Sequence, residues 1–351
     1  MKTSSILLFG VYLPLLLALA AGCKKDSDNP PSTGMALLDE TFAAVQQINN
    51  IKSLVVVRND TLIREAYFGS GGADVAHDVR SVTKSITALL VGIAIDQGFI
   101  SSVDQQIGGF LRPLVDTITP EKAKITIRDL LTMSSGFEWD ELTSVSGYNL
   151  WAGAANQVQY VLNKPLIAQP GQRFAYNSGA FHLLSVILSR ATGKTTLDFA
   201  KQYLFEHLEI TTSTWETDNQ GYNNGSAGLE LTPHDMVKIG QLILHHGEFH
   251  GKQVVTSKWI DDLGSFKITT NTAVPYGTGY GYGWWNGQSP QGSYTFAMGW
   301  GGQFIITVPT LDLVVVATNT WSGVPSAEAN DQWYRTVDLI MTGVLPAIAM
   351  W

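Results

Sequence analysis

The strongest constraint on the fold is a serine and a lysine three residues apart at the start of a long apolar helix. Residues 80–85 read RSVTKS, and the following stretch, 85–95, is apolar enough to be a buried helix that stops at Gly98. Ser81 would lie at the helix N-terminus, with Lys84 on the same face. The lysine amine could take the serine proton, and the free helix N–H groups favour negative charge beside Ser81. The pair predicts nucleophilic catalysis, although a plain helix start with a solvated lysine has the same spacing.

Strand-like patterns lie at both ends of the chain, and helical patterns lie between them. The strands predicted near the N-terminus, 54–58 and 61–67, are joined at Asn59-Asp60, a dipeptide typical of hairpin turns. We predict further strands at 280–285, 294–298, 302–308 and 311–317, helices at 37–48, 85–95, 125–131, 180–191, 196–208, 232–245 and 331–344, and an aromatic loop over 137–155. This order indicates an α+β fold whose antiparallel sheet is built from both chain ends and flanked by helices, with an all-helical insertion.

The N-terminus resembles an export signal. Lys2 precedes an apolar run, 6–21, which is short for a membrane span and ends in small residues before Cys23. Cys23 is the only cysteine, so an intramolecular disulfide is excluded. The Gly-Cys pair resembles a bacterial lipoprotein box, with Ala20 at the position where leucine is usual. We therefore predict a signal peptide over 1–22 and lipidation of Cys23; an ordinary cleaved signal with an incidental cysteine is the alternative.

The next segment is a tether, and the rest is a single body of enzyme size. Residues 23–34 are polar and proline-containing, which predicts a flexible linker. Without residues 1–22 the chain has 21 basic and 30 acidic side chains, a net charge of −9, which argues against nucleic acid as a partner. We expect one domain over 35–347, which is long enough for an enzyme with a large core. Its sheet part is expected at about 35–80 and 210–347 and its helical part at about 81–209.

Four ordered segments carry a resemblance to a known family. They read RSVTKSITALLVGIAIDQGFI, ITIRDLLTMSSGFEWDE, PGQRFAYNSGAFHLLSVILSRATGKT and MGWGGQFIITVPTLDLVVVATN, and together they cover most of 38–333. The chain resembles the serine β-lactamase and penicillin-recognising superfamily. Within it, the segments are similar to the class C-like branch, which includes the family VIII carboxylesterases and the 6-aminohexanoate-dimer hydrolases. The resemblance implies the β-lactamase/transpeptidase-like fold, with no metal and no cofactor.

The resemblance also implies roles for individual residues. Ser81 matches the acylated nucleophile, and Lys84 matches the lysine that assists its deprotonation. Tyr176 matches the tyrosine of the second motif, which passes the proton to the leaving group. Whether Lys84 or Tyr176 is the formal base stays open, because the two groups titrate together. The backbone N–H groups of Ser81 and Gln303 match the two donors of the oxyanion hole.

Two departures from the β-lactamase pattern bear on the substrate. Trp300-Gly301-Gly302 stands where many β-lactamases have Lys-Thr-Gly or His-Thr-Gly, so the cation that holds the antibiotic carboxylate is missing. The second motif reads Tyr176-Asn177-Ser178 in place of Tyr-x-Asn, so the side-chain amide that binds the antibiotic's acylamino group is displaced. Both changes favour a neutral, apolar acyl substrate. We expect its site to be bounded by Trp300, Trp284 and Trp285, with Trp139 and Trp151 as further candidates, and Asn177, Gly301 and Gly302 to contact it.

Simpler interpretations exist for several of these residues. About half of the tryptophans are expected to be core residues without ligand contact. The cluster His245, His246 and His250 has no zinc-site spacing, which favours a surface turn. Ser134-Ser135-Gly136 lacks a nearby base and is expected only to shape a helix end.

The predicted function is hydrolysis of small ester or amide substrates through an acyl-enzyme on Ser81. The first alternative is a β-lactamase or D-alanyl-D-alanine carboxypeptidase acting on β-lactams or peptidoglycan. The second is a non-catalytic binder of envelope ligands, which intact Ser81, Lys84 and Tyr176 disfavour. We expect a lipid-anchored protein of the bacterial cell envelope with a small-molecule substrate; the sequence leaves the membrane leaflet, the physiological acyl group and the oligomeric state open.

Overall fold

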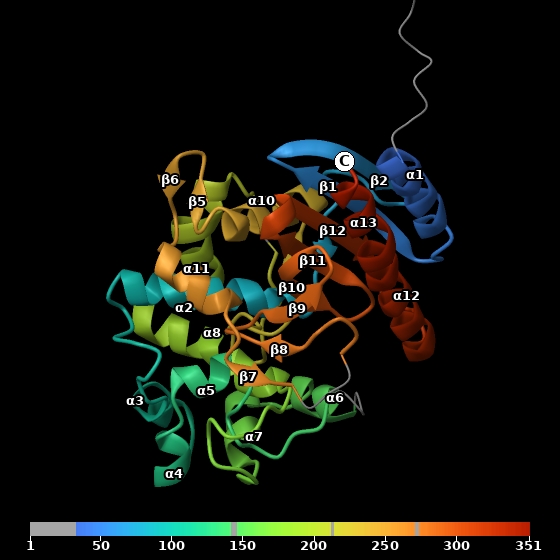
Figure 1. Ribbon diagram of the computed structural model, residues 1–351. Coiled ribbons are helices and arrows are strands. Elements are labelled where there is room, and N and C mark those ends of the chain that lie inside the picture. The colour runs from blue at the N-terminus through green and yellow to red at the C-terminus, as the bar shows by residue number, and fades with distance from the viewer. Residues whose placement is uncertain (1–32, 142–145, 212–213, 271–273) are drawn as a thin grey trace, which may run out of the picture.

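The computed structural model describes residues 33–141, 146–211, 214–270 and 274–351 (Figure 1). The strands are β1 (Ile51–Arg58), β2 (Thr61–Tyr67), β3 (His77–Asp78), β4 (Glu230–Leu231), β5 (Glu248–Phe249), β6 (Lys252–Gln253), β7 (Ile268–Thr269), β8 (Gly279–Tyr280), β9 (Trp285–Ser289), β10 (Gly292–Gly299), β11 (Gln303–Val308) and β12 (Leu313–Asn319). The α-helices are α1 (Thr33–Val45), α2 (Val82–Asp96), α3 (Gly108–Leu111), α4 (Pro120–Ala123), α5 (Ile127–Leu131), α6 (Ser146–Ala152), α7 (Gln157–Asn163), α8 (Ser178–Thr192), α9 (Thr196–Ala200), α10 (Pro233–Leu244), α11 (Ser257–Gly264), α12 (Ser326–Leu339) and α13 (Leu345–Ala349).

One large antiparallel sheet joins the two ends of the chain. Its strand order is β2-β1-β12-β11-β10-β9-β8-β7, so β1 pairs with β12, in the register Val55 opposite Val316. The β1–β2 turn places Asn59 and Asp60 at φ 49° and 55°. Both central residues of a type I′ hairpin have positive φ, and Asn and Asp tolerate it. The predicted α+β fold, with its sheet built from both termini, is confirmed.

Helices cover both faces of this sheet. Helices α1, α12 and α13 lie together on one side, and α2, α10 and α11 lie on the other (Figure 1). Burial on both faces explains why the inner strands are apolar without alternation: Leu54, Val55 and Val56 are all 0% exposed. Helix α2 packs against β10 and β11, so its N-terminus lies beside the strands from the C-terminal part of the chain.

The described elements between Val82 and Leu208 are helical, with only isolated bridges between extended segments. Helices α2 and α8 pack together in this part. The domain limits predicted from the sequence stay a prediction. No helix in the described ranges is both long and apolar enough to span a membrane. The predicted signal peptide and Cys23 lie outside the described residues.

Three predicted elements need correction. The stretch 137–155, predicted as a loop, contains α6. The predicted strand 280–285 is two strands, β8 and β9, interrupted because Gly283 has φ 74° and lies against α2, where a Cβ atom would be 2.8 Å from that of Ala88. The first helix begins at Thr33, inside the predicted tether, and ends at Val45.

Candidate active site

The start of α2 places Ser81 and Lys84 in hydrogen-bond contact. Ser81 is the N-cap residue, but its side chain makes no capping bond to the helix backbone. Its Oγ instead accepts a hydrogen bond from Lys84 Nζ at 2.9 Å. The preceding residue, Arg80, has φ 49°, and its N–H is held by Asp78 Oδ1 at 2.8 Å. A left-handed conformation is unfavourable for a non-glycine residue and persists only where the surrounding structure holds it, so the turn before Ser81 is a fixed feature.

The Lys84 amine is buried. The side chain is 1% exposed, and Nζ donates a second hydrogen bond to the carbonyl oxygen of Ser226 at 3.0 Å. Burial lowers the Lys84 pKa to about 7, helped by the Arg80 charge and opposed by the Glu141 carboxylate. Near neutral pH much of this amine is therefore unprotonated and able to accept a proton.

Tyr176 forms a cluster with Ser81 and Lys84. Lys84 Nζ lies 4.9 Å from the centre of the Tyr176 ring, and this ring stacks on Trp285 with centroids 6.0 Å apart. Burial, together with the Glu141 charge, raises the Tyr176 pKa, while a hydrogen bond with Ser81 acts in the opposite direction. The phenol therefore keeps its proton at neutral pH and can donate it.

The turn before β11 is held in place by buried amides. Gly301 and Gly302 have φ 82° and 101°. Gln303 Nε2 donates to the Asn319 carbonyl at 2.8 Å, and Asn319 Nδ2 donates to the Gly302 carbonyl at 2.6 Å. These bonds tie the Gln303 backbone to β12, which keeps its position fixed relative to the sheet.

The structure brings Glu141 into the cluster, a residue that the sequence analysis missed. Its carboxylate accepts hydrogen bonds from the Ser178 N–H at 2.9 Å, the Ser178 hydroxyl at 2.5 Å and Trp139 Nε1 at 2.9 Å. Its charge raises the pKa of both Lys84 and Tyr176. A single carboxylate in a stretch predicted as a loop carries no spacing signal, so only the second-motif departure at Ser178 pointed toward this region.

The predicted substrate-contacting residues fall into two groups. Trp284, Trp285 and Asn177 are 1–2% exposed, so at most a small part of each is accessible. Asn177 Oδ1 caps α8 by accepting the Ala180 N–H at 2.7 Å. Trp300 is only partly buried and donates to Asn330 Oδ1 at 3.2 Å. Direct contact of these residues with a substrate stays a prediction.

An aromatic group lies beside the turn that precedes Ser81. The Arg80 guanidinium lies 4.2 Å from the centre of the Trp321 ring and 5.6 Å from that of Tyr148. Trp321 in turn lies against Trp300, with centroids 6.1 Å apart. Trp151, predicted as a further wall residue, is 0% exposed and packs on His182; Trp139 is partly buried beside Glu141.

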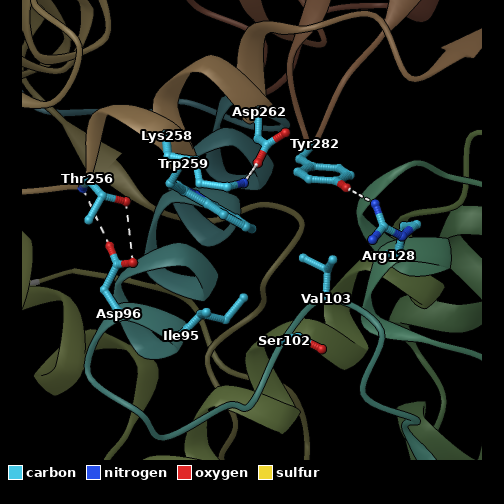
Figure 2. Close-up of a pocket in the computed structure, with 10 residues that line it drawn as sticks. All are labelled: Ile95, Asp96, Ser102, Val103, Arg128, Thr256, Lys258, Trp259, Asp262 and Tyr282. Atoms are coloured by element: carbon cyan, nitrogen blue, oxygen red, sulfur yellow. Dashed lines mark hydrogen bonds and ion pairs between the residues drawn. The ribbon is translucent and has the colours of Figure 1, made fainter.

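A cavity of about 350 Å³ lies at the far end of α2 (Figure 2). Ile95, Trp259, Arg128 and Tyr282 are among its lining residues. Because α2 has 15 residues, this end lies about 20 Å from Ser81 along the helix. The cavity is thus separate from the cluster around Lys84.

The remaining predicted features are peripheral or structural. His245, His246 and His250 follow α10, and the last two are exposed. Across the described ranges, no group of three or more His, Cys, Asp or Glu side chains could hold a metal ion. Ser134 and Ser135 are buried after α5, where the Ser134 N–H bonds to the Asp129 carbonyl.

Comparison with known proteins identifies the family. The model of the β-lactamase family matches residues 38–338. The chain belongs to the β-lactamase family. A curated relative, the 6-aminohexanoate-dimer hydrolase of Paenarthrobacter ureafaciens, is 23% identical over 287 residues, which cover 77% of this chain and 72% of that protein.

Solved structures of other proteins share the fold of this chain. A penicillin-binding protein from Bacillus halodurans is 18% identical, with a TM-score of 0.64 and coverage of 83% of this chain and 98% of that one. A hydrolase with promiscuous acyltransferase activity is 16% identical, with a TM-score of 0.67 and coverage of 85% and 99%. At these identities the likeness shows the β-lactamase/transpeptidase-like fold. The protein is a hydrolase-family member whose individual substrate the comparisons leave unassigned.

Proposed function

We propose that this β-lactamase-family protein is a serine hydrolase that cleaves small ester or amide substrates through an acyl-enzyme on Ser81. The observation that carries the proposal is the contact between the buried Lys84 amine and Ser81 Oγ at 2.9 Å. An amine with a pKa of about 7 beside a hydroxyl is a base placed at the nucleophile.

Lys84 and Tyr176 have separate roles in the proposed acylation step. Ser81 Oγ attacks the substrate carbonyl carbon while its proton passes to Lys84 Nζ. The carbonyl oxygen becomes an oxyanion, stabilised by the N–H groups of Ser81 and Gln303. Tyr176 then donates its proton to the departing alcohol or amine and recovers one from Lys84, which leaves the acyl group on Ser81. Attack of water on this ester, with the proton transfers reversed, releases the acid.

The opposite pKa shifts of the two groups favour Lys84 over Tyr176 as the base. Burial lowers the pKa of the amine and raises that of the phenol. A phenol in this state is a proton donor at neutral pH, whereas the amine is a proton acceptor. We therefore propose Lys84, and not Tyr176, as the base that takes the Ser81 proton.

Labelling with a fluorophosphonate tests the nucleophile. The wild type should react, Ser81→Ala should not, and the adduct should lie on the peptide that contains Ser81. Ser134→Ala, which removes a buried hydroxyl outside the cluster, is the matched control and should label normally. Labelling that persists in Ser81→Ala would refute the acyl-enzyme, and folded wild type that never labels or turns over would favour the non-catalytic envelope-ligand binder.

The substrate class follows from Trp300. An indole stands where many β-lactamases place a cation, so we propose neutral, apolar acyl groups, and short-chain aryl esters should be hydrolysed faster than cephalosporins. The name of the curated relative, 6-aminohexanoate-dimer hydrolase, supports including small amides. A β-lactamase or D-alanyl-D-alanine carboxypeptidase is the alternative, and faster cephalosporin than ester hydrolysis at matched concentration would establish it.

Trp300→Lys separates these two activities. A charge restored near the acyl-binding region should contribute roughly 1.5–3 kcal/mol to binding a substrate carboxylate. The variant should gain penicillin acylation and lose activity on apolar esters, whereas Trp300→Phe should keep the ester preference. If Trp300→Lys leaves both activities unchanged, Trp300 does not set the specificity.

We also propose that the protein is held in the bacterial cell envelope by a lipid on Cys23. The sequence pattern around Ala20 and Cys23 supports this proposal. Globomycin should block processing, fatty-acid labelling should require Cys23, and Cys23→Ser should release protein from the membrane fraction. Stable attachment requires more than one acyl chain. Wild-type protein that is processed without lipid would favour an ordinary signal peptide.

A further inference from the structure

A buried histidine–aspartate pair is connected to the Lys84 amine through the backbone of Gly225 and Ser226. His182 is on α8, and its Nε2 lies 3.0 Å from Asp218 Oδ2; both side chains are 0% exposed. Asp218 Oδ1 also accepts the backbone N–H groups of Gln220 and Tyr222 at 2.8 and 2.9 Å. Burial raises the Asp218 pKa, but the hydrogen bonds from His182 and from the Tyr222 and Gln220 backbone N–H groups outweigh it, so the net pKa lies below its usual value.

The hydrogen bonds of His182 fix its tautomer. The Gly225 N–H donates to His182 Nδ1 at 3.2 Å, so Nδ1 must present a lone pair. The ring proton is therefore on Nε2, where it is donated to Asp218. A neutral imidazole in this tautomer is the form that can hold Gly225 and Asp218 together.

The carbonyl groups of two consecutive residues, Gly225 and Ser226, face α2. The Gly225 carbonyl accepts Thr87 Oγ1 at 2.9 Å, and the Ser226 carbonyl accepts Lys84 Nζ at 3.0 Å. Gly225 also lies close to α8, because a Cβ atom there would be 2.7 Å from the Cβ of Ser185. The backbone of Gly225 and Ser226 is thus clamped between α8 and α2, and it presents the Lys84 amine with its acceptor.

We propose that His182, held by Asp218, is a positioning residue for the Lys84 base. By fixing Gly225, it places the Ser226 carbonyl so that one Lys84 N–H is engaged there. In the neutral amine the 2.9 Å contact with Ser81 Oγ can then reverse, with the hydroxyl donating to the Nζ lone pair. The inference rests on the proposed acyl-enzyme. It differs from a simple core-filling role, which would need the volume of the imidazole but not the acceptor at Nδ1.

Two substitutions separate these roles. His182→Asn places an oxygen near the Nδ1 position and can still accept the Gly225 N–H, but it loses Asp218. His182→Gln reaches toward Asp218 and leaves the Gly225 N–H without its acceptor. Both remove the imidazole and should lower the thermal unfolding midpoint by similar amounts. Fluorophosphonate inactivation of Ser81 should slow roughly ten- to a hundredfold in His182→Gln and by about threefold or less in His182→Asn.

The pH profile gives a second readout. A carbonyl acceptor favours the charged form of an amine, so loss of the Ser226 contact should lower the Lys84 pKa. The acid limb of the inactivation profile should therefore move to lower pH in His182→Gln and stay near the wild-type position in His182→Asn. Asp218 is the charged group that contacts the imidazole, and Asp218→Asn should resemble His182→Asn.

Thr87 and Ser189 supply a second arm and a control. Thr87→Val removes the hydroxyl bound to the Gly225 carbonyl and should slow inactivation, whereas Thr87→Ser should not; this pair decides the question if the His182 variants do not fold. Ser189 lies on the same helix as His182, and Ser189→Ala removes its hydrogen bond to Thr196 on α9. This variant should react like the wild type. Equal rates in His182→Gln and His182→Asn, or in Thr87→Val and Thr87→Ser, would overturn the inference while Ser81 labelling continued to support the hydrolase. Absence of Ser81 labelling in the wild type would refute the acyl-enzyme itself.

Discussion

Replacing Lys84 with methionine should remove a pH dependence of stability that the buried amine imposes on the wild type. The Lys84 side chain is 1% exposed, and burial lowers its pKa from 10.5 to about 7. In the unfolded chain the amine returns to its ordinary pKa, so between about pH 7 and 10.5 the unfolded chain binds more protons than the folded protein. The free energy of unfolding therefore rises with pH across this window and falls as the pH is lowered.

The size of the effect follows from the two pKa values. A single amine with these values contributes about −4 kcal/mol to the free energy of unfolding at pH 7 and about −2 kcal/mol at pH 9. Between pH 7 and pH 9, the free energy of unfolding of the wild type should therefore rise by about 2 kcal/mol more than that of Lys84→Met. For an m-value of about 3 kcal/mol/M, the gain corresponds to a shift of about 0.7 M in the urea midpoint.

Urea unfolding at pH 7 and pH 9 measures this difference, because other titrating groups are common to both proteins. The exposed Lys194 provides a control, and Lys194→Met should keep the pH dependence of the wild type. The same amine should give the acylation rate an acid limb near pH 7. If the wild type and Lys84→Met respond equally to pH, the amine is not losing its proton in this range and the assignment of Lys84 as base is wrong.

Three further substitutions test other parts of the site. Tyr176→Phe should lower kcat on a short-chain aryl ester at least roughly a hundredfold without changing the unfolding midpoint, because it removes the proton donor; near-normal turnover would contradict that role. Glu141→Gln should move the acid limb of the pH–rate profile to lower pH, since the carboxylate raises the Lys84 pKa, and an unmoved limb would exclude this electrostatic effect. Gly302→Ala should destabilise the protein by about 1–3 kcal/mol in denaturant titrations, because φ is 101° and a Cβ atom would lie 2.5 Å from Asn319 Nδ2; a wild-type free energy of unfolding would show that the turn relaxes.

Local features of this chain were predictable, and contacts between distant segments were not. Ser81 and Lys84 are three residues apart on one helix, so their spacing alone predicts that they meet. The Ser226 carbonyl that completes the amine's environment is a backbone group, and backbone groups have no residue signature. Glu141 and His182 are single polar residues whose importance depends on where α8 and the neighbouring loops pack.

The wrong predictions also have physical causes. The aromatic and glycine residues at 280–285 alternate as in a strand, yet Gly283 must bend to let the chain pass close to Ala88. The segment 146–152 lacks the polar and apolar periodicity of a surface helix, and its helix was missed for that reason. Tertiary packing decided both cases, and a single sequence carries little information about it.

The pairing of β1 with β12 also sets the order in which this protein can be completed. The two strands are separated by more than 250 residues, and β1 lies in the sheet between β2 and β12. At about 5–20 residues per second, the ribosome needs roughly 10–50 s to make the chain between them. Until then the apolar edge of β1 that pairs with β12 has no permanent neighbour, so the β1–β2 hairpin of the nascent chain needs protection from aggregation. The last strand to emerge completes the sheet.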